Sequence, residues 1–186
     1  MATCSNYNCD SLTDHEVSNE SCLGPRNGGS AQLIIFDCGV TVTDPTDGTE
    51  INNLITAGSA YLVENVKAGM DAPTPVTIAS TTSCGTDRVI NLDYSGTIED
   101  YTVTESNTSA FWGILAKGRQ MGNMMLYLCE QDGYSNKIIW IDAEINFSGG
   151  LVVPNVNTEA IYYNMSFTFR KNGPVEYLDA PTGVFS

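Results

Sequence analysis

The sequence predicts a mainly β protein, with an antiparallel sandwich-like or barrel-like body, one short α-helix and an extended arm at each end. Two runs within residues 137–170 carry this prediction, because apolar and polar side chains alternate along both of them. Strand side chains point to opposite faces with a period of two, so such runs indicate half-buried antiparallel strands. The 17 Gly and 7 Pro in 186 residues are typical of a chain with many turns.

The two alternating runs are expected to form two long strands, each with one buried and one wet face. The first run sets one group of side chains, Ile139, Ile141, Ala143, Ile145 and Phe147, against another, Trp140, Asp142, Glu144 and Asn146. The second sets Ile161, Tyr163, Met165, Phe167 and Phe169 against Tyr162, Asn164, Ser166, Thr168 and Arg170. Gly149, Gly150 and Pro154 separate the two strands.

The chain divides into a polar, cysteine-containing N-terminal arm (1–30), a β-rich domain (31–175) and a C-terminal arm (176–186). Earlier strands are expected at 33–36, 61–66, 89–98 and 124–129, with a turn at 44–48, a short element at 51–55 and a connection at 71–75. The helix is expected at 107–117, because four apolar residues there share one helical face and Gly118 follows. Ser106 or Asn107 can cap its first turn.

The charge balance is strongly acidic, with 22 acidic against 8 basic residues and a net charge of −14. Binding to nucleic acid or anionic membrane depends on Lys and Arg, so both are disfavoured. No stretch approaches the roughly 18–20 apolar residues of a membrane span. The first residues also lack the features of a signal peptide. We therefore expect a protein that folds in a cytoplasm.

The cysteines and the single histidine offer little chemistry. Cys4, Cys9, Cys22 and Cys38 lie near His15, but their spacing does not match paired zinc ligands. Reduced thiols are the favoured interpretation, with zinc or disulfides as alternatives. Cys84 and Cys129 are more distant in the sequence, and the apolar run around Cys129 indicates a core position.

Two groups of acidic residues are candidate sites. Asp142 and Glu144 would project from the same side of one strand, about 6–7 Å apart, which is a glycosidase-like separation. Acidic neighbours on the wet face of a strand are common for solvation alone, and this is the favoured interpretation. Asp44, Asp47 and Glu50 lack the twelve-residue calcium-loop pattern. We expect no catalytic residue, no cofactor and no metal ion, and hence no enzyme.

Trp140 stands on the polar side of its predicted strand, and Tyr162 stands on the corresponding side of the next. Large aromatic side chains in such positions are covered either by another element or by another subunit. We expect a subunit interface at Trp140 and Tyr162, with Val184 and Phe185 of the C-terminal arm also available to a neighbour.

The order of these features resembles that of phage tail tube proteins, also called major tail proteins. The residues that carry most of the likeness are 141–145 and 166–173, within a similarity that spans residues 30–175. The resemblance implies rings, commonly hexameric, whose strands close an inner β-barrel, and which stack into a tube. DNA would pass without specific binding, and Asp142 and Glu144 are candidate acids of the lumen. The implied partners are further copies and other virion tail proteins, and the implied location is the virion tail, assembled in the host cytoplasm.

Other functions fit the same pattern. A capsid decoration or tail-completion protein would also be β-rich and non-catalytic. A carbohydrate-binding β-sandwich would use Trp140, Tyr162 and Asp142 as a sugar platform. A hydrolase would use Asp142 and Glu144.

Overall fold

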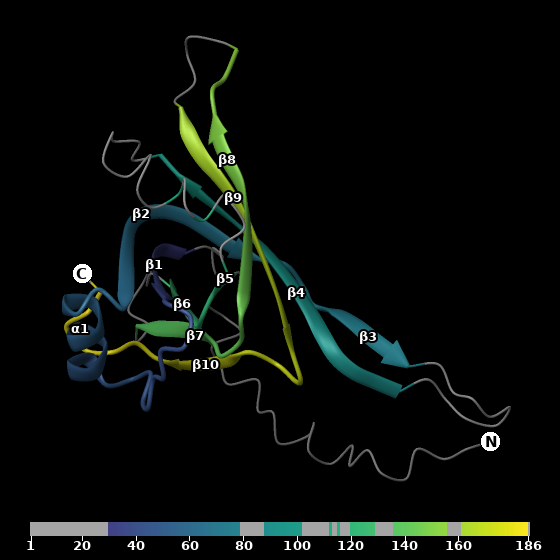
Figure 1. Ribbon diagram of the computed structural model, residues 1–186, viewed down its shortest axis with the longest axis horizontal. Coiled ribbons are helices and arrows are strands. Elements are labelled where there is room, and N and C mark those ends of the chain that lie inside the picture. Colours follow the sequence, from purple (N-terminus) through teal and green to yellow (C-terminus); the bar gives the residue numbers. More distant parts are fainter. Residues whose placement is uncertain are drawn as a thin grey trace, which may run out of the picture.

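The computed structural model describes residues 30–78, 88–101, 112, 115, 120–128, 136–155 and 161–185 (Figure 1). These residues form one helix, α1 (Gly48–Thr56), and antiparallel strands. The strands are β1 (Ser30–Phe36), β2 (Ala60–Met70), β3 (Thr74–Ile78), β4 (Arg88–Asp100), β5 (Gln120–Met121), β6 (Met124–Leu128), β7 (Lys137–Ile141), β8 (Ile145–Val152), β9 (Tyr162–Lys171) and β10 (Glu176–Asp179). The predicted mainly β, sandwich-like body is confirmed, and the described strands do not close into a barrel.

The strands pair in the order β10-β7-β6-β1-β2-β4-β9-β8-β5, and β3 pairs with β4. Figure 1 shows β2 arching across the molecule. The first part of β2 pairs with β1, and its last part, from Val66 to Met70, pairs with β4. We call β10, β7, β6 and β1 layer one, and β3, β4, β9 and β8 with residues 66–70 of β2 layer two. The bend at β2 brings the two layers face to face.

The main core lies between the layers, and the alternation of β9 shows how it is built. Tyr163, Met165, Phe167 and Phe169 are buried, whereas the side chains between them face outward, as the sequence predicted. Trp112 and Leu115 also lie in this core. The Trp112 indole N–H donates to Asp100 Oδ2 at the end of β4 (2.6 Å). This buried bond ties residue 112 to layer two.

A second cluster covers the other face of layer one. β1 contributes Leu33 and Ile35 to the main core and Ile34 and Phe36 to this second cluster. Ile51 of α1 packs in the second cluster too, together with residues of β6, β7 and the C-terminal segment. Because both faces of layer one are buried, β1 is a continuous apolar run rather than an alternating one.

Helix α1 begins where the sequence predicted only a turn and a short element. Asp47 caps it by accepting a hydrogen bond from the Thr49 N–H (2.8 Å), and Glu50 accepts from the N–H groups of Thr43 and Asp44 (2.7 and 2.9 Å). A carboxylate in the first helical turn also suits the helix dipole. The helix expected at 107–117 falls outside the described residues, apart from Trp112 and Leu115.

Two predictions about the second half of the chain are corrected. The run at 137–147 is not one strand, because β7 ends at Ile141 and β8 begins at Ile145. β7 pairs in layer one and β8 in layer two, so the chain must cross between layers at 142–144. Residues 176–185 are part of the body rather than an arm, since β10 pairs with β7 and Phe185 stacks on Tyr127 (4.5 Å). The expected N-terminal arm lies outside the described residues, apart from Ser30.

Candidate functional site: the exposed surfaces of layer two

A two-stranded ribbon extends from one end of layer two. It consists of β3 and residues 88–91 of β4, and we call it the β3–β4 ribbon (Figure 1). β9 pairs with β4 only from Leu92 onward, so no third described strand supports the ribbon. Ile78 and Val89 are 56% and 59% exposed on it, and Ile90 is exposed as well. Two-stranded ribbons are marginally stable alone in water, so a partner surface would stabilise this one.

A second apolar group lies at the opposite end of layer two. We call residues 151–153 and 161–162, at the ends of β8 and β9, the β8–β9 tip. Leu151, Val153 and Ile161 are exposed there. β4 runs from the ribbon at Arg88 to this end of the layer, where its last residue, Asp100, pairs with Tyr163. Layer two therefore carries exposed apolar side chains at both ends.

Each side of layer two has an open stretch among the described strands. On one side, β2 pairs with residues 96–100 of β4 and continues into layer one, whereas β3, next to it along β4, pairs with β4 alone. On the other, β5 covers β8 only at Ile145 and Asn146, so residues 147–152 have no described strand beyond them. Unpaired backbone groups along an edge are a template for pairing with another chain.

The outward side of layer two is a surface of short polar side chains, which we call the polar face. Ser95 lies opposite Thr168 and Thr97 lies opposite Ser166 across β4 and β9, and Ser148 adjoins Ser166 from β8. The face is made up of Asn146, Ser148, Asn164, Ser166, Thr168, Ser95 and Thr97 with four charged residues, Lys67, Asp93, Glu99 and Arg170.

The four charges of the polar face are paired. Arg170 donates to both carboxylate oxygens of Asp93 (2.5 and 2.9 Å), and Lys67 Nζ lies 3.4 Å from Glu99 Oε2. The hydrogen bond from Arg170 lowers the pKa of Asp93 below its usual value. The Tyr101 O–H also donates to Glu99 (3.0 Å), and this hydrogen bond raises the pKa of Tyr101. The face thus has little net charge of its own.

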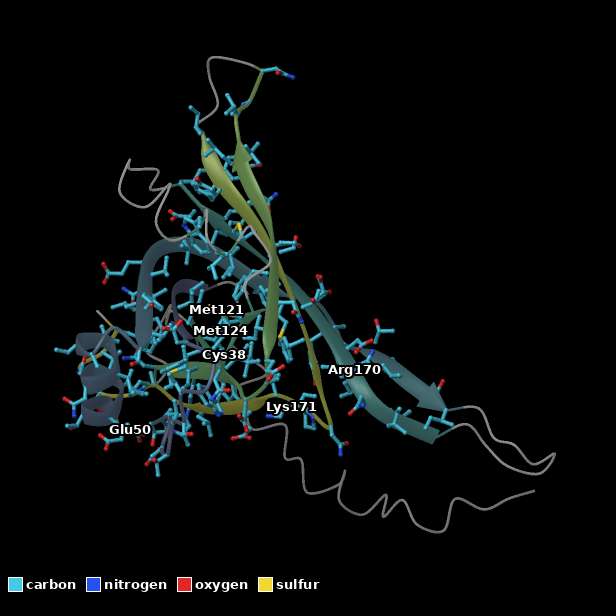
Figure 2. The ribbon with its side chains drawn as sticks, viewed as in Figure 1. Cys38, Glu50, Met121, Met124, Arg170 and Lys171 are labelled. Atoms are coloured by element: carbon cyan, nitrogen blue, oxygen red, sulfur yellow. The ribbon has the colours of Figure 1, made fainter. Side chains whose placement is uncertain are left out.

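Two shallow hollows adjoin the polar face. One, of about 500 Å³, is lined by residues that include Asp93, Arg170 and Thr168. The other, of about 450 Å³, is lined by Asp142, Glu144, Arg170 and Lys171, among others; the two cations are labelled in Figure 2. The structure therefore places the two candidate lumen acids near cations.

The candidate acids do not have the geometry that a glycosidase pair was expected to have. Asp142 and Glu144 are exposed and lie in the link between β7 and β8, not on one strand. The strand spacing that suggested a catalytic separation therefore does not apply to them.

The interface prediction is wrong for two of its four residues, Trp140 and Val184. The Trp140 side chain is only 5% exposed and meets Phe36 edge-on, with ring centroids 5.7 Å apart. Val184 is buried in the same cluster. Side chains covered by their own chain offer no area to a second copy or to a sugar. Tyr162 stays partly exposed and stacks on Tyr101 (4.9 Å), and Phe185 also stays partly exposed.

Metal ligands do not gather in the part of the chain that the structure describes, where no group of three or more His, Cys, Asp or Glu could hold an ion. Cys38 is exposed and free. The other five cysteines and His15 lie outside the described residues. Asp44, Asp47 and Glu50 serve backbone N–H groups around the start of α1, which accounts for their proximity in the sequence.

The ribbon was not foreseen from the sequence, and of the polar face the sequence predicted the wet side of the strand at 161–170 but not its pairing with β4. Pro73 and Pro75 predicted a connection at 71–75, but proline is tolerated in edge strands such as β3. The run Thr74 to Ile78, with Val76 and Ile78 alternating with threonine, was the available signal.

None of the described helices is long and apolar enough to cross a membrane. No protein-family model matches the chain, and no curated protein matches it.

Proposed function

We propose that this protein is a virion structural subunit of a phage tail tube, which self-assembles into stacked rings that conduct DNA. The observation that carries the proposal is that layer two, in the part of the chain that the structure describes, has an open stretch of strand on each side and exposed apolar side chains at both ends. Its partners would be further copies of itself and other virion tail proteins, and DNA would pass without specific binding. The proposed role is structural and not enzymatic. The protein would be located in the virion tail.

The open edges support ring formation. β3 and residues 147–152 of β8 lie on opposite sides of layer two and have similar lengths. Pairing one edge with the other edge of the next copy is a heterologous contact, which closes into a ring when the rotation permits. Each copy would thereby satisfy backbone groups that it leaves unpaired alone.

The apolar ends support stacking. The β3–β4 ribbon and the β8–β9 tip lie at opposite ends of β4, a strand of 13 residues that spans roughly 40 Å at about 3.3 Å per residue. A ribbon that meets the tip of a copy in the next ring would bury both groups. This contact is open-ended, so it extends a ring into a tube.

The charge of the chain supports a DNA conduit rather than a DNA-binding protein. A net charge of −14 repels the phosphate backbone. Conduction needs this property, since Lys and Arg contacts would hold DNA in place.

Negative-stain electron microscopy of the purified protein tests the proposal, and we expect hollow tubes. Val89→Lys should reduce tube length, because it places a charge in the apolar contact of the ribbon. Asn53→Lys, on the exposed surface of α1, is the matched control with the same added charge and should leave tubes unchanged. Monomers or trimers alone would instead favour a decoration protein, and tubes of equal length from both variants would remove the ribbon from the stacking contact.

A further inference from the structure

We infer that the polar face lines the bore of the tube, so that the wall met by DNA is charge-compensated and rich in hydroxyl groups rather than acidic. The inference rests on the proposed function and assigns the inner surface to particular side chains. In this assignment the polar face, rather than Asp142 and Glu144, supplies the main residues of the lumen.

The polar face is the broad sheet surface that the described chain leaves uncovered. The inner faces of both layers form the main core. The outer face of layer one packs against α1 and the C-terminal segment. The polar face, on the outer side of layer two, keeps side chains such as Ser95, Ser166 and Thr168 exposed.

The polar face is unsuited to tight protein contact. Stable interfaces concentrate large apolar and aromatic side chains at their centre. Layer two places such side chains on the ribbon and on the tip, at Val89 and Val153 for example. The face between them offers hydroxyl and amide groups that water already solvates. Contacts between copies therefore fall at its edges and ends.

Steric bulk decides whether the polar face lies on the inner or the outer side of the ring. When copies join through the edges of layer two, neighbouring strands come about 4.8 Å apart. Layer one and α1 both stack on the same side of layer two. If layer one and α1 lay on the concave side of a closed ring, they would clash with layer one and α1 of the neighbouring copies. On the convex side these elements have more room, because neighbouring copies spread apart there. The polar face must therefore be the concave, inner side.

The resulting wall has balanced charge. Its strands carry two cations, Lys67 and Arg170, each paired with an acid of the same face. Further acids lie at the margin of the face: Asp71 accepts a hydrogen bond from Ser95 (3.1 Å), and Asp142 and Glu144 line a hollow together with Arg170 and Lys171. Cations that are already paired gain little by binding phosphate, because the bond to the carboxylate must be given up first. Asp44 and Asp47, near the start of α1, would then face the outside.

A cysteine-labelling experiment tests the assignment. Ser166→Cys and Thr97→Cys place a thiol on neighbouring strands of the polar face, and Thr56→Cys places one on α1. Tubes of each variant are treated with a maleimide-coupled gold cluster and imaged, and the unmodified chain gives the background from native cysteines. We expect gold along the tube axis for Ser166→Cys or Thr97→Cys, and gold on the outer surface for Thr56→Cys.

The outcomes separate the inference from the proposed function. Gold on the outer surface for both polar-face variants overturns the inference while leaving the tube intact. Failure of both variants to assemble, when Thr56→Cys assembles, also overturns it, because the face would then be a contact between copies. Absence of tubes from the unmodified chain refutes the proposed function itself.

Discussion

Phe167 is the side chain whose removal should destabilise the fold most clearly. Its ring is fully buried between the rings of Phe147 and Phe169, each with its centroid 6.4 Å away. It also fills the space above Gly96, where an added Cβ would lie 2.3 Å from the Phe167 ring. Truncation of a buried Phe to Ala costs about 3–5 kcal/mol, because the transfer free energy is lost and a cavity remains. Domains of ordinary stability unfold with about 5–15 kcal/mol, so Phe167→Ala should remove a large share of the total.

Urea unfolding, followed by fluorescence at concentrations below assembly, measures this effect. With a slope of about 2 kcal/mol per molar, a loss of about 4 kcal/mol lowers the midpoint by about 2 M. Thr168→Ala is the matched control on the next residue, since its side chain faces outward and should change the free energy of unfolding by less than about 0.5 kcal/mol. Equal effects of the two substitutions would contradict the burial of Phe167, and a larger loss from Thr168→Ala would show that the two faces of β9 are assigned the wrong way round.

Three further substitutions probe other parts of the fold. Gly96→Ala should lower the free energy of unfolding by at least about 1–3 kcal/mol, since its Cβ would overlap the Phe167 ring and the Gly69 carbonyl; wild-type stability in urea would contradict this packing. Asp47→Ala should cost about 1 kcal/mol through loss of the α1 cap, which a thermal melt would detect as a lower midpoint, and an unchanged midpoint would exclude the cap. Arg170 lowers the pKa of Asp93 in the folded state. Their pairing therefore stabilises the fold at pH values above the unfolded pKa of about 3.9, and this stabilisation is lost as the pH falls through the lower pKa of the folded state. The stability difference between wild type and Arg170→Gln should therefore be small, present at pH 7 and absent at the lowest pH; a difference that persists there would contradict the assignment.

The elements predicted well from the sequence are those whose burial follows a simple period. β9 has one core face and one wet face, so its alternation gave both the strand and its buried residues. β1 appeared as an apolar run because α1 and the C-terminal segment cover its second face.

The elements that were predicted wrongly are those whose structure depends on which layer each residue joins. The local pattern of apolar and polar residues does not indicate the layer. The alternation through Asp142 and Glu144 continues across a break, because the chain leaves layer one and enters layer two without changing its polarity period. Trp140 looked like an exposed aromatic for the same reason. Its neighbours on that side are polar, but they lie beyond the end of β7, and Phe36 covers the indole from another strand.

The candidate surfaces could be predicted only in part from the sequence. The acidic balance and the strand content indicated a β-rich protein that does not hold DNA. The ribbon depends on the pairing of β3 with the start of β4, and the polar face depends on the register of Thr97 with Ser166 and of Asp93 with Arg170. These pairings join residues far apart in the sequence, so they become visible only in the folded chain.

Sedimentation velocity over a range of protein concentrations tests most directly whether layer two is completed by further copies of the chain. We predict that fast-sedimenting polymers of increasing length appear as concentration rises and that Val89→Lys shifts their onset to higher concentration. A single species of the monomer's mass at every concentration would contradict it.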